Sequence, residues 1–320
     1  MTRGPGHTRR DLAKLAAASL LAGRSVVAAG TSPRPGVIGT APLAAEGLDR
    51  AAALAAMEHS LQRALGVDRA AAGLAGLFSA SDTVGIKLSC LGGPRLSPRV
   101  VLVEALVDLL AEAGVPRSRI VVFERSSREL ERAGFEIRRS GGPYLCRGTD
   151  NQWDREPSTS GSIGSCFARE VSTTCTALIS FGVVKDHDFA GVSAGLKNWY
   201  GAIHNPNKYH GTNCDPYVAD VVRHPFIAGK LRLTVLDGVA AQCQGGPAFF
   251  AGGQFPLGLV AASADPVVAD LWAWRVIDAE RARRGLASLR VDGREPAFIA
   301  TAARYGLGVG DTSRLKVVEG

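Results

Sequence analysis

Residues 176–214 read TALISFGVVKDHDFAGVSAGLKNWYGAIHNPNKYHGTNC. The apolar run Thr176–Val184 passes directly into a loop rich in Lys, His, Asp and Asn. A continuous apolar run of this length predicts a strand that is buried on both faces, as the strands of parallel sheets are. Ligands of open α/β sheets bind beyond the carboxyl ends of such strands. The stretch therefore predicts an α/β fold with a site at the end of this strand.

Similar runs occur on both sides of this stretch and alternate with segments of helical periodicity. Strands are expected at Thr83–Cys90, Ile120–Glu124, Leu231–Leu236, Leu257–Ala262 and Leu315–Val318. Helices are expected at Glu46–Leu65, 100–113, 129–137, 267–284 and Pro296–Tyr305, with Ser97 and Asp265 as N-caps. The pattern predicts a mostly parallel sheet with helices on both faces and a ligand crevice at the carboxyl-terminal edge of the strands.

The chain divides into three predicted regions. Residues 1–29 are expected to be an export signal, and the Pro- and Gly-rich residues 30–45 a linker. Residues 46–320 are expected to form a single α/β domain. Within it, residues 138–170 form a long polar excursion, and loops of that length in compact domains are usually functional or disordered.

The export prediction rests on the pair Arg9–Arg10, which precedes a weakly apolar run, Leu12–Ala29. This order resembles a twin-arginine signal, and Val27-Ala28-Ala29 fits a cleavage site with small residues. We therefore expect the twin-arginine export machinery as a partner and a periplasmic or extracellular location. Lys14 and Arg24 interrupt the run, so no stable membrane span is expected. The alternative is an ordinary basic amphipathic start.

The net charge of +7 does not indicate a nucleic-acid partner. The first 36 residues hold six basic residues and one acidic residue, and no basic stripe alternates with aromatic residues elsewhere. The six cysteines include no C-x-x-C pair, so a ferredoxin-type iron–sulfur cluster is not expected. Disulfides in an oxidising compartment and buried free thiols both remain possible interpretations.

Lysine is scarce in this chain, which has 30 Arg but seven Lys. Lys185, Lys197 and Lys208 all lie in the quoted stretch, together with His187, His204 and His210. An ammonium is a compact charge whose pKa moves readily, whereas a guanidinium stays protonated. The cluster favours a functional site over the alternative, a solvated polar loop.

Polar side chains at the strand ends supply the candidate residues. Lys87 and Lys185 follow buried runs, as do Asp237 and Asp265. Gly195 precedes Lys197 and Asn198, so that backbone N–H groups and an ammonium could together hold a small anion. The alternative for this glycine-rich string is a tight turn between a loop and a helix.

His187 lies between Asp186 and Asp188, which suits a general base with an orienting carboxylate, or a metal ligand. Further candidate metal ligands are His204, His210 and Cys214. Their spacing is irregular, so a metal is possible and its identity is unknown.

Several of these segments also resemble domain-of-unknown-function family 362. The resemblance runs from about Asp82 to about Ala279 and is carried by Gly85–Lys87, Val184–His187, Gly191–Gly201, His210, Leu236–Gly238, Gly245–Pro247 and Ser263–Asp270. It implies an α/β protein whose reaction is not settled. Many members of the family carry ferredoxin-type clusters or twin-arginine signals, and this chain shares only the signal.

The sequence thus predicts an exported enzyme that depends on a cofactor or metal, performs redox or isomerase chemistry, and acts on a small anionic substrate. The alternative is a non-catalytic protein that binds an anionic ligand or metal. The predicted catalytic residues are Lys87, Lys185 and His187. The predicted substrate-binding residues are Gly195, Lys197, Asn198, His210, Asp237 and Asp265.

Overall fold

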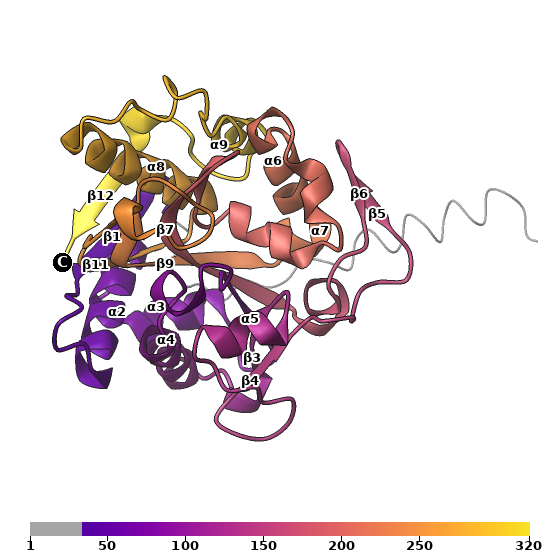
Figure 1. The fold of residues 1–320 in the computed structure, drawn as a ribbon. Helices are drawn as coiled ribbons and strands as arrows, with labels where there is room; N and C mark the ends of the chain where they lie inside the picture. Colours follow the sequence, from indigo (N-terminus) through magenta and orange to yellow (C-terminus); the bar gives the residue numbers. More distant parts are fainter. Residues whose placement is uncertain (1–33) are drawn as a thin grey trace, which may run out of the picture. The chain divides into compact units, whose positions relative to one another are not determined.

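The fold is built on one large twisted sheet (Figure 1), seen in a computed structural model that describes residues 34–320. The strands follow the order β12-β1-β11-β9-β7-β2-β3-β4, with β10 added beside β9 and β8 beside β7. Their bounds are β1 Val37–Pro42, β2 Val84–Leu88, β3 Ile120–Glu124, β4 Leu145–Gly148, β7 Ala177–His187, β8 Gly191–Ser193, β9 Leu231–Gln242, β10 Gln254–Phe255, β11 Leu259–Ser263 and β12 Lys316–Glu319.

The middle of the sheet is parallel. β4, β3, β2, β7 and β9 pair in parallel, so their carboxyl ends lie at one edge. β11 pairs antiparallel with β9, and β1 pairs antiparallel with β11. The fold is therefore an α/β fold with a mixed, mostly parallel sheet, which confirms the predicted class.

Helices cover both faces of the sheet, as Figure 1 shows. Their bounds are α2 Arg50–Leu65, α3 Ala70–Leu77, α4 Val100–Glu112, α5 Ser127–Arg132, α6 Tyr217–Arg223, α7 Pro225–Ala228, α8 Pro266–Arg283 and α9 Phe298–Arg304. Neighbouring strand residues alternate between the faces: Ile179 packs with α2, α3 and α4, whereas Leu178 packs with α6, α8 and α9. This burial of both faces explains why the strand sequences are apolar without alternation.

Short elements complete the chain. The 3-10 turns are η1 Gly93–Arg95, η2 Arg117–Arg119, η4 Lys197–Ala202, η5 Pro206–Tyr209, η6 Thr212–Cys214, η7 Ala251–Gly253 and η8 Thr312–Arg314, and η3 Glu170–Thr174 is a π-helical turn. The predicted polar excursion 138–170 is structured: it contains the edge strand β4 and a separate two-stranded sheet formed by β5 Ser158–Ser160 and β6 Ile163–Ser165.

Two local predictions need correction. The expected linker 30–45 contains β1, which is buried between β11 and β12 because Val37 and Ile38 pack into the core. Ser97 does not cap α4; its hydroxyl donates to the carbonyl of Gly93, and Arg99 is the N-cap residue. By contrast, α2 ends as predicted at Gly66, whose positive φ of 69° suits glycine.

None of the described helices is long and apolar enough to cross a membrane. All six cysteines are free thiols, five of them buried, so the predicted alternative of buried thiols describes most of them. The export signal predicted for residues 1–29 lies outside the described residues.

Candidate functional site

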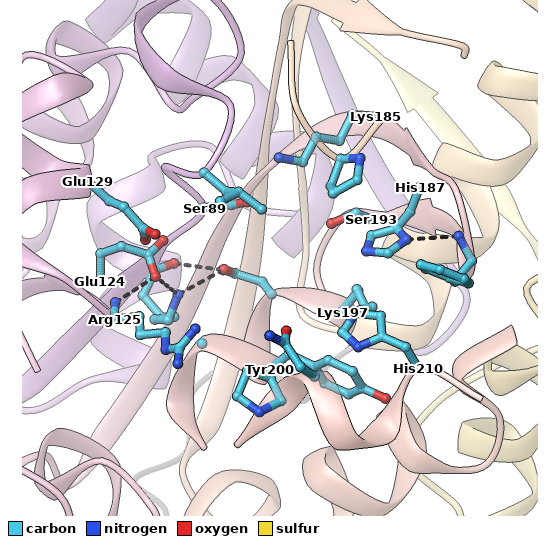
Figure 2. Close-up of a pocket in the computed structure, with 18 of the residues that line it drawn as sticks. Ser89, Glu124, Arg125, Glu129, Lys185, His187, Ser193, Lys197, Tyr200 and His210 are labelled. Carbon is cyan, nitrogen blue, oxygen red and sulfur yellow. Dashed lines mark hydrogen bonds and ion pairs between the residues drawn. The ribbon is translucent and has the colours of Figure 1, made fainter. Parts of the chain in front are cut away.

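A cavity of about 570 Å³ opens at the carboxyl ends of β2, β3 and β7. Lys87 lies in β2 and Glu124 is the last residue of β3. Lys185 and His187 lie among the last three residues of β7. Because these three strands are parallel neighbours, their ends bring the side chains to one edge. The segment 197–210 closes the cavity from the other side. Figure 2 shows the labelled side chains around this space.

Lys87 and Glu124 form a buried ion pair on one wall. Nζ of Lys87 donates to Oε1 of Glu124 at 2.7 Å, to the Leu88 carbonyl at 2.6 Å and to Oδ1 of Asn198 at 3.2 Å. Glu124 also accepts the backbone N–H groups of Cys90 and Arg125. All three ammonium donors are therefore used, and the side chain of this lysine is held in one position.

Lys185 differs sharply from Lys87. Its side chain is 1% exposed, and its Nζ has no hydrogen-bond partner among the described residues. Burial lowers its pKa from 10.5 to about 8, against the raising effect of the Glu124 charge. The side chain extends into the cavity toward Ser89 (Figure 2). A free amine that titrates near neutral pH thus faces the cavity.

Lys197 forms the third cationic point of the cavity. Its Nζ lies 3.2 Å from Nε2 of His210 and 3.6 Å from the ring centre of Tyr200, a cation–π contact. Burial is the largest cause that lowers the pKa of Lys197 from 10.5 to about 8, and the charge of Lys185 contributes to the same shift. The hydroxyl of Tyr200 donates to the Tyr209 carbonyl at 2.6 Å, which fixes the ring under the ammonium.

His187 is neutral and its tautomer is set by the backbone. Its Nδ1 accepts the N–H groups of Phe189 and Ala190 at 3.2 and 3.3 Å, which assigns the ring proton to Nε2. Oδ1 of Asp188 is 2.9 Å from the same Nδ1, but an ion pair would need a protonated ring. Burial and the Lys197 charge oppose that by lowering the pKa of His187 to about 2. The ring is therefore suited to donate a hydrogen bond rather than to act as the predicted base.

Six of the predicted site residues line this cavity: Lys87, Lys185, His187, Lys197, Asn198 and His210. The Asn198 amide is fully occupied by the protein. It donates to the Lys87 carbonyl at 2.9 Å and to the Ser180 hydroxyl at 3.1 Å, besides accepting from Lys87. Asn198 is thus a positioning residue for Lys87 rather than a direct ligand group.

Two predicted carboxylates do not line the cavity. Asp237 lies within β9, which continues to Gln242, and its carboxylate binds the backbone N–H and guanidinium of Arg99 at 2.9 and 2.6 Å. Asp265 follows β11, which runs antiparallel to β9, so its strand ends at the opposite edge of the sheet. It caps α8 through Val267 and Val268 and binds the N–H groups of Gly36 and Val309.

The glycine-rich turn before Lys197 does hold an anion, but the anion belongs to the protein. The backbone N–H groups of Gly195 and Leu196 both donate at 2.8 Å to Oδ2 of Asp270, in α8. Asp270 is fully buried, which raises its pKa to about 7. The predicted contribution of Gly195 to binding an external anion is therefore corrected: its N–H is already used.

The four predicted metal ligands do not lie together at one site. The rings of His187 and His210 stack with centroids 5.5 Å apart. His204 is instead exposed beside Trp153, and neither it nor Cys214 lines the cavity. Within residues 34–320 no three His, Cys, Asp or Glu side chains are grouped as metal ligands.

Sequence reasoning omitted several residues that line the cavity, among them Glu124, Arg125, Glu129, Tyr200 and Gly201. Glu124 was identifiable from its place at the end of the apolar run IVVFE. Gly201 is constrained by space: a Cβ there would lie 2.6 Å from Nζ of Lys87. Glu129 approaches from α5, and burial together with the Glu124 charge raises its pKa.

Comparison with known proteins adds a family but no activity. The family model described as "Domain of unknown function (DUF362)" matches residues 84–275, more than half of the chain. No curated protein matches the sequence significantly. One similar solved structure is a protein from Thermotoga maritima, determined by the Northeast Structural Genomics Consortium, with 10% sequence identity and a TM-score of 0.43. The match covers 75% of this chain and 60% of that chain.

Proposed function

The chain belongs to the DUF362 family, and we propose that it is an enzyme of isomerase type, which binds a small anionic molecule in this cavity and transfers a proton through a buried lysine. The observation that carries the proposal is the Lys185 ammonium, which is fully buried, faces the cavity and has no partner among residues 34–320. An unpaired buried charge is costly, and a bound anion removes that cost.

The three lysines have separate tasks in this proposal. Lys87 is held in place by Glu124 and Asn198 and forms part of the cavity wall. Lys197 has one neutral polar partner, His210, so two of its donors remain for a carboxylate or phosphate oxygen. Lys185 is left to exchange a proton, because its pKa of about 8 is close to working pH.

The substrate also has an apolar part in this proposal. Leu91 and Phe189 line the cavity and are 53% and 52% exposed, so they form an apolar rim at its opening. Neutral His187 offers an Nε2–H donor that does not compete for the substrate's negative charge. An organic acid with a short apolar body fits such a surface better than a bare inorganic ion does.

We also propose that the protein is exported, on the basis of the sequence motif near its N-terminus. Arg9–Arg10 ahead of the run Leu12–Ala29 supports recognition by the twin-arginine machinery and a location in the periplasm or outside the cell. A folded α/β domain with deeply buried lysines is compatible with that route, because the route carries proteins that have already folded.

The test combines binding and proton exchange. Calorimetry with lactate, pyruvate, malate and inorganic phosphate measures anion binding. Proton NMR in D₂O measures exchange of the hydrogens next to the carboxylates of lactate and malate and of the methyl hydrogens of pyruvate. We expect binding of at least one organic anion and exchange that Lys185→Met removes. The exposed neighbour variant Lys208→Ala should behave as wild type, since Lys208 does not line the cavity.

If anions bind but none of them exchanges its hydrogens with D₂O, the protein is the alternative, a non-catalytic protein that binds an anionic ligand. Absence of both binding and exchange for every anion would overturn the proposal.

A further inference from the structure

We propose that Lys185 is a covalent nucleophile that forms an imine with the carbonyl group of a small 2-oxo acid. This inference rests on the proposed function, because it uses the same cavity and names the substrate class. The geometry that supports it is the contrast among the three buried lysines, of which only Lys185 presents an unbonded Nζ to the cavity within the described residues.

The other two lysines are excluded by their contacts. The lone pair of an amine must be free to attack a carbonyl carbon. Lys87 donates to three acceptors, one of them a carboxylate, so its Nζ is fully engaged by the protein. Lys197 is held between His210 and the face of the Tyr200 ring, and both contacts favour its charged form. Lys185 has no such contact.

The pKa of Lys185 allows this attack, and the contacts described above, not the pKa, separate it from Lys197, whose pKa is also about 8. A pKa lowered from 10.5 to about 8 raises the neutral fraction of the amine at pH 7 by roughly 300-fold. Desolvation is the largest cause, as in other lysines that form Schiff bases.

A substrate with a carboxylate next to its carbonyl group would also use the Lys197 ammonium. Lys197 and His210 line the cavity with Lys185, and the charge of Lys185 is close enough to lower the pKa of Lys197. A 2-oxo acid can therefore place its carboxylate at the Lys197 ammonium and its carbonyl carbon at Lys185. A neutral ketone lacks the first contact, so it should react poorly.

The step is balanced without an oxidant or reductant. Neutral Nζ of Lys185 forms a bond to the carbonyl carbon while the π electron pair of the carbonyl moves to its oxygen. A proton then moves from the nitrogen to that oxygen, which gives a neutral carbinolamine. The nitrogen then expels the hydroxyl group, which leaves as water after receiving a second proton. Glu129 lines the cavity, and its carboxyl group is the acid that this proposal assigns to supply that proton. The product is a protonated imine on Lys185.

Reductive trapping tests the proposal. The full-length protein is incubated at pH 7 with glyoxylate, pyruvate, 2-oxobutyrate or 2-oxoglutarate and with sodium cyanoborohydride, which delivers hydride to the imine carbon. Intact-mass spectrometry measures the adduct, and peptide mapping locates it. We expect one adduct per chain, on Lys185, formed at least tenfold faster than on Lys208 or with acetone as the carbonyl compound.

Matched variants separate this inference from anion binding. Lys185→Met should lose the adduct, Lys208→Ala should keep it, and Lys197→Ala should slow it at least tenfold. Adducts spread over exposed lysines, or no adduct on Lys185 with any of the four acids, would overturn the inference. If calorimetry still detects binding of the same acids in that case, the proposed anion site stands and only the covalent step fails. Because the mapping uses wild-type protein, an unstable variant does not block the test.

Discussion

Nζ of Lys197 lies 3.2 Å from Nε2 of His210, and this neutral ring nitrogen is the only hydrogen-bonding partner of that ammonium among residues 34–320. An ammonium that was only structural would be expected to have a carboxylate partner, as Lys87 has in Glu124. Lys197 instead keeps a weak neutral partner and the face of an aromatic ring. Because no carboxylate neutralises the Lys197 ammonium, it is available to bind an anionic ligand.

Lys197→Ala should weaken binding of pyruvate at least tenfold while leaving the melting temperature nearly unchanged. The lost ammonium is the proposed anion contact, but its burial without a countercharge contributes no net stability. Lys197→Arg should also fail, because the wider guanidinium does not fit the space between His210 and Tyr200. Calorimetry and thermal unfolding measure the two effects. Unfolding of Lys197→Ala at ordinary temperature would show instead that the lysine is a structural partner.

Anion affinity should be constant from pH 6 to about 7.5 and fall above pH 8. Lys185 and Lys197 have pKa values of about 8 in the free protein, so both lose their protons above that pH. A bound anion favours the charged forms, and the affinity should fall by up to tenfold per pH unit for each lysine. His187, with a pKa of about 2, does not titrate in this range. A dissociation constant that stays flat to pH 9.5 would show that neither ammonium contacts the anion.

Glu124→Ala should destabilise the fold by about 3–5 kcal/mol, because it leaves the buried Lys87 ammonium without its countercharge. Urea unfolding measures the change, and Glu131→Ala on the exposed side of α5 is the matched control, expected within about 0.5 kcal/mol of wild type. The double variant Lys87→Met/Glu124→Leu should recover most of the loss. If the double variant is as unstable as Glu124→Ala, the packing of Glu124 and not its charge is what matters.

The sequence predicted the parallel part of the sheet and the residues at its edge, because buried apolar runs and the polar residues after them are local signals. The sequence does not reveal the direction of a strand. The predicted strand Leu257–Ala262 overlaps β11, which is antiparallel to β9, and this direction places Asp265 at the opposite edge of the sheet. Nor does an apolar run show where a strand ends: the sequence predicts Asp237 at the end of its strand, whereas β9 continues to Gln242.

The glycine-rich turn shows a different limit of sequence reasoning. Its composition predicted backbone N–H groups that bind an anion, and Gly195 and Leu196 do so. The anion is Asp270, 75 residues further along the chain from Gly195. Only the packing of α8 against the sheet brings that carboxylate to the turn, and no local pattern records such a pairing. In the same way, the tautomer of His187 depends on how the backbone folds at Phe189 and Ala190.

Replacing both Arg9 and Arg10 with Lys should leave the protein inside the cell. A guanidinium pair ahead of a weak apolar run is the feature that predicts the twin-arginine route, and Lys keeps the charge while changing the group. Fractionation of cells that express the full chain, with processing followed by mass, measures the effect. Arg3→Lys, outside the pair, is the matched control and should be exported normally. Export and processing of the double variant would contradict the prediction.

Asp270→Asn should match or exceed the stability of wild type above pH 7, whereas Asp270→Ala should lose about 2–4 kcal/mol. The folded pKa of about 7 exceeds the ordinary value of 3.8, so the folded protein binds a proton that the unfolded chain releases between about pH 4 and pH 7. The contribution of this carboxyl to stability therefore falls as pH rises through that window, and it is a cost above pH 7. Asparagine keeps an oxygen for the N–H groups of Gly195 and Leu196 without the buried charge, whereas alanine leaves both donors unpaired.

Urea unfolding at pH 5 and pH 8 measures the change, with the exposed Asp68→Asn as control. Equal losses for Asp270→Asn and Asp270→Ala at pH 8 would show that the charge itself holds the turn before Lys197.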